Sequence, residues 1–309
     1  MELITGENDK GRRLDRILRK ALPYHPLQLI HRLLRQGRVL VNGKPAKAQD
    51  HIECGVKISI PLKDAPKQAK TSPILPPPEI IWQGLELLAV NKPEGTAVHG
   101  DSNSSLDSNS SLDDTVRSFL AEKLPHSLSF KPGPLHRLDK PSSGIVIFST
   151  GIEGARLFTS LMRERKVHKT YLAIVEGNIN REEIWEDRLE RDGEKKKTFV
   201  SKSGSEDGKT AITKIKPVAQ EGNYSLIMAK IVTGRTHQIR AQAASHRHPL
   251  AGDRKYGGHS FDGDSKGGFF LHAWKIEFLD IKISAPIPQK FKEKIKALFS
   301  NVNPDRFSD

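Results

Sequence analysis

Residues 134–149, PLHRLDKPSSGIVIFS, decide the interpretation of this sequence. One carboxylate, Asp139, stands between Arg137 and Lys140, and a Pro-Ser-Ser-Gly turn follows at once. The apolar run at 145–148 then has the pattern of a buried strand. The stretch therefore predicts a charged loop that leads directly into the core. Such a charged triplet is either a surface salt-bridge cluster or part of a functional site, and the rest of the chain decides between them.

The stretch belongs to a long unit that is expected to span residues 80–299. Strand-like and helix-like segments alternate there without a repeated βαβ pattern, which favours an α+β fold. Apolar patterning predicts strands at 85–92, 144–149, 170–177, 224–232 and 271–278, and helices at 112–124, 152–165 and 236–246. The charge-rich residues 186–211 are expected to form polar hairpins or loops, and residues 300–309 a loose tail.

A smaller unit is expected over residues 1–63. Two short amphipathic helices are predicted within 12–22 and 27–37, the second ending at Gly37. The pair Asn42-Gly43 signals a hairpin turn, and apolar residues at 56, 58 and 60 alternate as in a half-buried strand. The unit is therefore expected to be a small α/β domain. The proline-rich residues 64–79 are expected to form a semi-rigid linker.

Charge and cysteine content narrow the class of protein. The 309 residues carry a net charge of +13, from 50 Lys and Arg against 37 Asp and Glu. Residues 1–63 contribute 13 basic and 6 acidic side chains, so a surplus of 7 sits in this short unit. Such a surplus favours a polyanionic partner, either nucleic acid or an acidic membrane surface. No apolar run is long enough for a transmembrane helix, no secretion signal is evident, and a single cysteine fits a reducing cytosol.

The basic side chains of the first unit gather on its polar faces. Arg32, Arg35 and Arg38 lie on or beside the second predicted helix, and Lys44 follows the hairpin turn. This arrangement resembles the αL-motif RNA-binding domain, which occurs in a ribosomal small-subunit protein and is appended to several RNA-modifying enzymes. The resemblance implies that these four side chains contact RNA.

Four segments of the larger unit carry a second, more specific resemblance. They are GPLHRLDKPSSGI (133–145), HKTYLAIVEG (168–177), TGRTHQIRAQAASHRHPLAGDRKYG (233–257) and LHAWKIEF (271–278). In this order they closely resemble the RluA-type pseudouridine synthase family, over roughly residues 80–290. The earlier VNKPEGTAVHG (90–100) looks like that family's opening strand and loop. Within the family, the chain is most similar to the RluC-like branch, which acts on large-subunit ribosomal RNA.

The resemblance implies a mixed, largely antiparallel sheet with flanking helices, and an isomerase that converts uridine in RNA to pseudouridine without a cofactor or metal. In such enzymes the N1–C1′ bond breaks, the uracil turns, and C5 joins C1′. The family's essential carboxylate, a nucleophile or a base at the sugar, matches Asp139, and its arginine partner matches Arg240. A guanidinium favours the charged form of a buried carboxylate, which otherwise tends to be protonated. We expect His237 and Arg240 to lie on one helical face.

Two further side chains are expected in the site. Tyr171 matches the family's active-site tyrosine, whose ring can stack on uracil and whose hydroxyl can assist the final removal of the C5 proton. An ordinary half-buried strand tyrosine is the alternative. The target uridine must leave its stack, and we expect the Arg137 guanidinium to fill the vacated space. A phosphate or structural contact is the alternative for Arg137, while His136 is expected only to shape the loop.

Other interpretations of these residues have less support. His246, His248 and Asp253 could be metal ligands, but no cysteine accompanies them. Lys140 could suggest a Schiff base, and residues 92–100 a phosphate loop, but neither has a supporting motif. A catalytically silent RNA-binding factor in ribosome assembly remains an alternative function. A glycosidase is a third, although it usually needs a second carboxylate about 5 Å away.

One tandem repeat, SNSSLD at 102–107 and 108–113, predicts a low-complexity loop to which we assign no role. Taken together, the sequence predicts a cytoplasmic, monomeric RNA-modifying enzyme with an appended RNA-binding domain.

Overall fold

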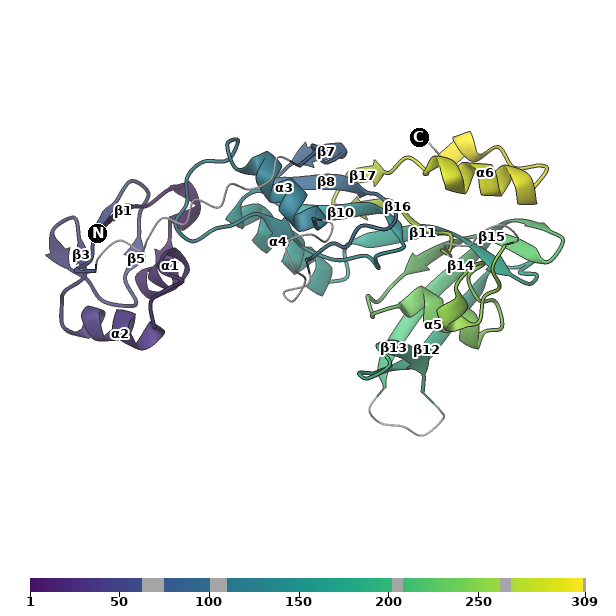
Figure 1. The fold of residues 1–309 in the computed structure, drawn as a ribbon, viewed down its shortest axis with the longest axis horizontal. Coiled ribbons are helices and arrows are strands. Elements are labelled where there is room, and N and C mark those ends of the chain that lie inside the picture. The colour runs from purple at the N-terminus through teal and green to yellow at the C-terminus, as the bar shows by residue number, and fades with distance from the viewer. Residues whose placement is uncertain (63–74, 101–109, 202–207, 262–267, 308–309) are drawn as a thin grey trace.

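The computed structural model describes residues 1–62, 75–100, 110–201, 208–261 and 268–307. A small N-terminal domain with helices α1 and α2 lies beside one end of a larger domain, and α6 lies at the opposite end (Figure 1). The expected linker at 64–79 falls mostly outside the described residues. Within the described part of the chain, no helix is long and apolar enough to cross a membrane.

The N-terminal domain packs two helices against short strands. α1 (Leu14–Ala21) and α2 (Leu27–Arg35) each bury one apolar face in a common core. As predicted, Gly37 follows α2 with φ +65°, a conformation that glycine adopts without strain. The Asn42-Gly43 hairpin is also confirmed, joining β3 (Leu40–Val41) to β4 (Lys44–Pro45). The remaining elements are β1 (Glu2–Ile4), η1 (Glu7–Asp9), β2 (Arg12–Arg13), β5 (His51–Ile52) and β6 (Lys57–Ser59).

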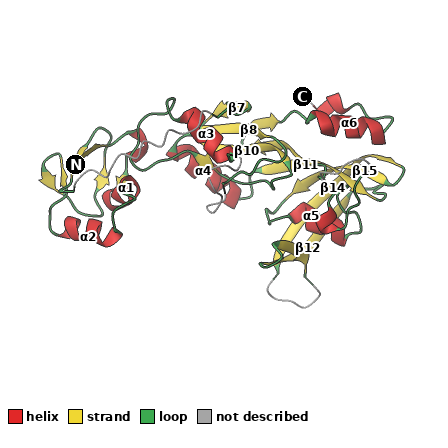
Figure 2. Cartoon of the chain, in the orientation of Figure 1, coloured by secondary structure: helices red, strands yellow, loops and turns green. Residues whose placement is uncertain are grey.

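The larger domain is built on an 11-stranded sheet, and its main path runs β13-β12-β14-β15-β11-β16-β10-β8-β7. Strands β10 and β16 are parallel, whereas the other pairs are antiparallel, which confirms the α+β class (Figure 2). Its strands are β7 (Ile80–Gly84), β8 (Leu87–Lys92), β9 (Gly133–Pro134), β10 (Ser143–Ser149), β11 (His168–Glu176), β12 (Glu183–Asp192), β13 (Lys197–Val200), β14 (Lys209–Glu221), β15 (Tyr224–Ile231), β16 (Leu271–Phe278) and β17 (Ile281–Ser284). Because β16 lies between β10 and β11, the segments around Asp139 and Tyr171 are separated by a single strand.

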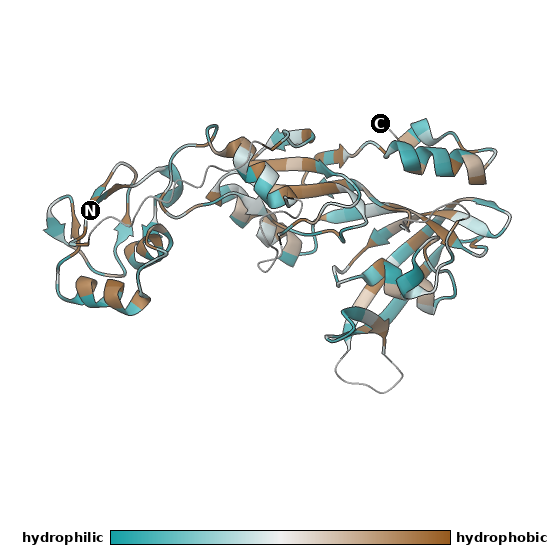
Figure 3. Cartoon of the chain, in the orientation of Figure 1, coloured by the Kyte–Doolittle hydropathy of each residue, from teal (hydrophilic) through white to brown (hydrophobic). Residues whose placement is uncertain are grey.

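Helices cover both faces of this sheet. Side chains of β11 alternate, so that Tyr171, Ala173 and Val175 join one apolar cluster while Leu172 and Ile174 join another. The first cluster includes α3 (Leu112–Leu120) and α5 (Gln238–Ser245), and the second includes α6 (Gln289–Leu298). The helix α4 (Ile152–Arg163) packs on a third cluster behind β8 and β10. Figure 3 shows apolar residues concentrated in these central strands.

Two sequence predictions about local order need correction. The tail at 300–309 is not loose throughout, because η3 (Pro304–Phe307) buries Phe307, whose carbonyl accepts a hydrogen bond from Trp274 Nε1 at 2.7 Å. The repeat-containing loop ends at Ser111, which caps α3 by accepting a hydrogen bond from the Asp114 amide. Residues 102–109 of that repeat lie outside the described residues.

Candidate active site

The turn between β9 and β10 fixes the position of Asp139. Its carbonyl accepts a hydrogen bond from the Ser142 amide at 3.0 Å, which closes the Pro-Ser-Ser turn. Gly144 has φ +108°, and a Cβ atom there would lie 2.3 Å from the Ala273 carbonyl oxygen. Glycine is therefore required here, because a side chain would keep β10 from packing this closely against β16 so soon after Asp139.

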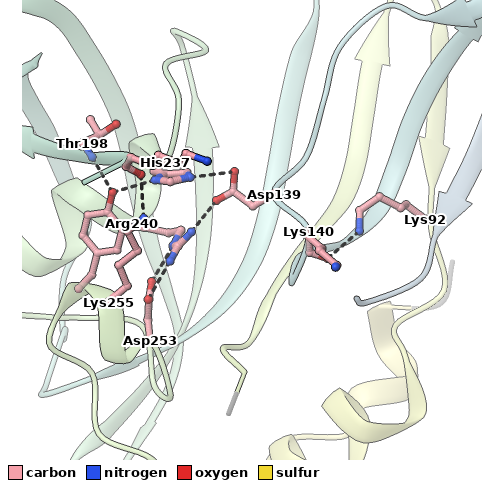
Figure 4. A network of polar contacts seen from close by, with 10 residues as sticks. Lys92, Asp139, Lys140, Thr198, His237, Arg240, Asp253 and Lys255 are labelled. Atoms are coloured by element: carbon pink, nitrogen blue, oxygen red, sulfur yellow. Dashed lines mark hydrogen bonds and ion pairs between the residues drawn. The ribbon is translucent and has the colours of Figure 1, made fainter. Parts of the chain in front are cut away.

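The predicted pairing of Asp139 and Arg240 is present. Arg240 Nη1 lies 3.0 Å from Asp139 Oδ2, although the two residues are 101 positions apart (Figure 4). The Arg240 side chain is 7% exposed and that of Asp139 is 17% exposed, so water screens the pair only weakly. The geometry matches the expectation that Arg240 lies across from this carboxylate as its cationic partner.

A second carboxylate, which we did not predict as a site residue, orients Arg240. Arg240 Nε and Nη2 donate to the two oxygens of Asp253 at 2.7 and 2.9 Å (Figure 4). The guanidinium also lies over the rings of Tyr256 and Phe269, 4.8 and 4.4 Å from their centroids. Burial opposes the charge of Arg240, but the carboxylates of Asp253 and Asp139 outweigh it and raise the pKa of Arg240. Arg240 thus presents one nitrogen to Asp139 while its other two are held in place.

The start of α5 brings His237 to the same carboxylate. His237 is not a helical residue, contrary to the expected 236–246 helix, but precedes α5 with φ +52°. Its Nε2 lies 3.7 Å from Asp139 Oδ1, and its Nδ1 lies 2.9 Å from the Tyr256 hydroxyl. Burial lowers the pKa of His237 despite the opposing charge of Asp139, so the imidazole is neutral at neutral pH. Gln238 anchors this turn, because its side-chain nitrogen, Nε2, donates to the Ile212 carbonyl and the Thr213 hydroxyl.

These groups line a cavity of about 270 Å³. Tyr171 lies on its wall, and burial, together with the charge of Asp139, raises the pKa of the tyrosine hydroxyl. Tyr171 therefore remains a neutral phenol over the physiological range. Arg137 is exposed at the cavity wall. His136, which also lines the cavity, is tied to β10, since its Nε2 accepts a hydrogen bond from the Ile147 amide.

Two lysines complete the surroundings of the cavity, and the sequence analysis missed both. Lys92 is fully buried beneath the loop that carries Asp139, where its ammonium donates to the carbonyls of Lys140 and Thr96 at 3.1 and 2.8 Å (Figure 4). Burial lowers its pKa to about 8, against the opposing charge of Asp139. Lys169 lines the cavity two residues before Tyr171, and burial lowers its pKa to about 8 as well. The segment 92–100 thus supports the loop that carries Asp139, since the Gly95 amide also donates to the Lys140 carbonyl.

The RNA-contact residues predicted in the N-terminal domain lie elsewhere. Arg32 and Arg35 are exposed on α2, Arg38 is exposed just after it, and Lys44 is exposed on β4. None of them lines the cavity around Asp139. The structure therefore does not bring the two predicted groups of residues together.

The three candidate metal ligands have separate partners. His246 Nε2 lies 3.1 Å from Asp187 Oδ2, His248 Nδ1 lies 3.0 Å from the Glu176 carbonyl, and Asp253 binds Arg240. In the parts of the chain that the structure describes, no group of three or more His, Cys, Asp or Glu side chains could hold a metal ion.

Comparison with known proteins agrees with this geometry. Residues 86–245 match the RNA pseudouridylate synthase family, and residues 12–55 match the S4 domain. The chain is 30% identical to ribosomal large subunit pseudouridine synthase C of Salmonella typhi, over 95% of each chain, and 29% identical to the same-named protein of Escherichia coli K12, over 94% of each. The structure of human RNA pseudouridylate synthase domain containing 4 superposes with a TM-score of 0.58 at 20% identity, covering 71% of this chain and 92% of that one. The chain therefore belongs to the RNA pseudouridylate synthase family, whose members are isomerases that act on RNA, and it carries an S4 domain at its N-terminal end.

Proposed function

We propose that this enzyme isomerises uridine to pseudouridine in large-subunit ribosomal RNA, in the cytoplasm, as a monomer. The substrate is supported by the names of its relatives, which cover nearly the whole chain. The S4 domain and the net charge of +13 support binding to RNA. A catalytically silent assembly factor is not favoured, because the site retains a paired carboxylate in a cavity.

The ion pair between Asp139 and Arg240 is the observation that carries the proposal. In the proposed role, the Asp139 carboxylate acts at the sugar of the target uridine, either by attack on C1′ or as a base. Arg240 pairs with that carboxylate, and Asp253 holds the Arg240 guanidinium in the orientation that the pair requires. The cavity of about 270 Å³ has the size of a site for one flipped base rather than for a helical segment.

Tyr171 and Arg137 have different proposed tasks. Tyr171 lines the cavity as a neutral phenol, so its ring is available to stack on the uracil. Its raised pKa disfavours a phenolate as the base for the C5 proton, and a hydroxyl that assists in that step does so in its protonated form. Arg137 is exposed beside Asp139, where a planar guanidinium can occupy the space left in the RNA stack.

The test replaces Asp139 with Asn, which preserves shape and removes the charge. We expect the purified Asp139→Asn variant to bind large-subunit ribosomal RNA as the wild type does, and to form no pseudouridine. Mapping pseudouridine in RNA from cells that lack the gene identifies the target uridines, and complementation with each form of the protein tests the residue. An Asn variant that restores the modification would overturn the role of Asp139, and an unchanged map in the deletion strain would overturn the choice of substrate.

A further inference from the structure

A set of hydrogen bonds clasps the N-terminal domain to the larger domain. Asp9 is fully buried, and its carboxylate accepts from the amides of Leu128 and Ser129 at 2.8 and 3.0 Å and from the hydroxyl of Ser127 at 2.9 Å. Burial alone would raise the pKa of Asp9, but these hydrogen bonds, with that of the Ser129 hydroxyl, hold it below its usual value. Asn8 Oδ1 also accepts from the amide of Ile152, the first residue of α4, at 2.8 Å. The two domains are thus held in a defined relation through buried polar contacts.

We call these contacts of Asp9 and Asn8 the clasp. Beside the clasp, a cleft of about 1230 Å³ lies between the two domains and is lined by residues of both. One wall is formed by the start of α1 and its neighbours, and the other by α4, which is visible beside the N-terminal domain in Figure 1. Five arginines line it: Arg12, Arg13, Arg16, Arg156 and Arg163. None of them belongs to the group predicted to bind RNA from the sequence.

The charges in this cleft do not balance. Arg13 pairs with Asp15 at 2.8 Å, and Arg156 pairs with Glu153 at 2.6 Å. Arg16 and Arg163 are exposed and have no ion-pair partner among the described residues. The remaining carboxylate at the wall, Glu86, accepts hydrogen bonds from the amides of Glu153 and Gly154, the second and third residues of α4.

Like charges also face one another across the two domains. Arg12 donates to the Ser129 hydroxyl at 2.9 Å, and burial lowers the pKa of Arg12. Asp9 opposes that fall, whereas Arg156 from the larger domain and Arg16 from α1 add to it. Arginines from both domains that repel one another in the free protein would be stabilised by an anion between them.

The cleft continues toward the active site along α4. Arg163, at the end of α4, lines both the cleft and a second hollow of about 180 Å³. That hollow is also lined by Arg165, Lys169 and Arg235, and the last two line the active-site cavity as well. The side-chain ammonium of Lys169 has no hydrogen-bond or ion-pair partner among the described residues, and burial is the cause of its lowered pKa. A basic surface therefore leads from the interdomain cleft to the cavity that contains Asp139.

We propose that the interdomain cleft binds the phosphate backbone of the substrate RNA and directs it along α4 into the active site. The inference rests on the proposed function, since it takes RNA as the substrate. Arg16 and Arg163 contact phosphates, so their contribution is independent of base sequence and sensitive to salt. The clasp at Asp9 fixes the distance between these contacts and the catalytic carboxylate. The enzyme would thereby recognise the shape of the RNA that flanks the target uridine, as well as the uridine itself.

The test compares Arg16→Glu with Lys296→Glu, an equal change of charge at an exposed position on α6, at the far end of the molecule. Both full-length variants are tested on two RNAs: an unmodified transcript of large-subunit ribosomal RNA, and a short hairpin around the mapped target uridine. We expect Arg16→Glu to weaken binding of the long transcript by about tenfold. The slope of log affinity against log salt concentration should become less steep by about 1, the change expected for the loss of one phosphate contact. Binding of the short hairpin, and the single-turnover rate at saturating RNA, should stay unchanged. Lys296→Glu should weaken binding of the long transcript less than twofold.

Outcomes of this test separate the two proposals. If the wild type forms pseudouridine while Arg16→Glu binds the long transcript as tightly as Lys296→Glu does, the cleft does not bind RNA and the proposed function stands. If the wild type forms none in either RNA, the proposed function fails, and the binding comparison still decides the role of the cleft. Equal weakening by both variants would show a general effect of net charge and would also overturn the inference.

Discussion

Arg240 in the active site and Arg35 on α2 carry the same charge in opposite surroundings. The Arg240 side chain is 7% exposed, bound by two carboxylates, and lies over two aromatic rings. Arg35 is exposed at the end of α2 in the N-terminal domain. A buried charge with a fixed partner interacts strongly with that partner, and losing either member leaves the other unpaired in the interior. An exposed charge attracts its partners only weakly, because water and salt screen it. The contrast predicts large, specific effects at Arg240 and small, salt-dependent effects at Arg35.

The largest effect is expected for Arg240→Lys. A lysine keeps the charge but cannot reach Asp139 while also holding both oxygens of Asp253, so one carboxylate is left without its partner. We expect the single-turnover rate to fall by about 100-fold or more, because breaking a buried pair costs about 3–5 kcal/mol. Thermal unfolding of the same variant checks that it folds. A folded Arg240→Lys enzyme with full activity would show that charge alone is sufficient at this position.

A smaller loss is expected for Asp253→Asn, which leaves the Asp139 pair in place but loosens the orientation of Arg240. Asp253 is a positioning residue, so kcat should fall by about tenfold while KM for RNA stays the same, consistent with the loss of one charge-assisted hydrogen bond. Asp253→Glu, which retains the carboxylate, should recover part of the loss. A change in KM with kcat unaffected would instead place Asp253 in RNA binding.

An intermediate case is Lys169, which is partly buried but unpaired among the described residues. Its lowered pKa of about 8 means that its charge is present below that pH and is lost as the pH rises through it. We expect kcat/KM of the wild type to decline by a few fold between about pH 7 and pH 9. Lys169→Arg, which stays charged, should flatten that decline, although Lys92 has a similar pKa and remains in both proteins. Identical pH profiles for the two proteins would exclude a role for the Lys169 charge.

The smallest effect is expected for Arg35→Ala on α2. Removing one exposed phosphate contact should weaken RNA affinity by about threefold near 0.1 M salt, and less as salt increases. The rate at saturating RNA should not change. Lys296→Ala on α6 is the matched control, and an equal loss in that variant would mean that α2 has no particular part in RNA binding.

Some elements of the site were predictable because their signals are local. The turn around Gly144 and the strand that carries Tyr171 each follow from residue types that are adjacent in the chain. The helix predicted at 236–246 is two residues shorter at its start, because His237 adopts a left-handed conformation that lets it reach Asp139. Residue propensity does not foresee that turn, since His237 gains its position from contacts with Tyr256 and Asp139.

Other parts of the site depend on contacts between distant segments. Asp253 lay within a quoted motif, but only the fold shows that its carboxylate meets Arg240, 13 residues earlier. Lys92 lies 48 residues before the Lys140 carbonyl that it supports. The packed end of the chain was missed for the same reason, since a short polar segment reveals nothing about the Trp274 side chain on which it rests.

By periodicity and charge, the sequence predicted an α+β fold and a basic N-terminal domain, because these depend on short stretches of chain. The class of protein, and Asp139 with Arg240 as site residues, followed from the resemblance of several ordered motifs to a known family. Only the tertiary structure decided that Asp253 orients Arg240, that Lys169 lines the cavity while Lys92 supports the loop of Asp139, and that a basic cleft lies between the two domains. Burial and charge pairing arise from segments that are remote along the chain and adjacent in space, and for that reason they appear only once the chain has folded.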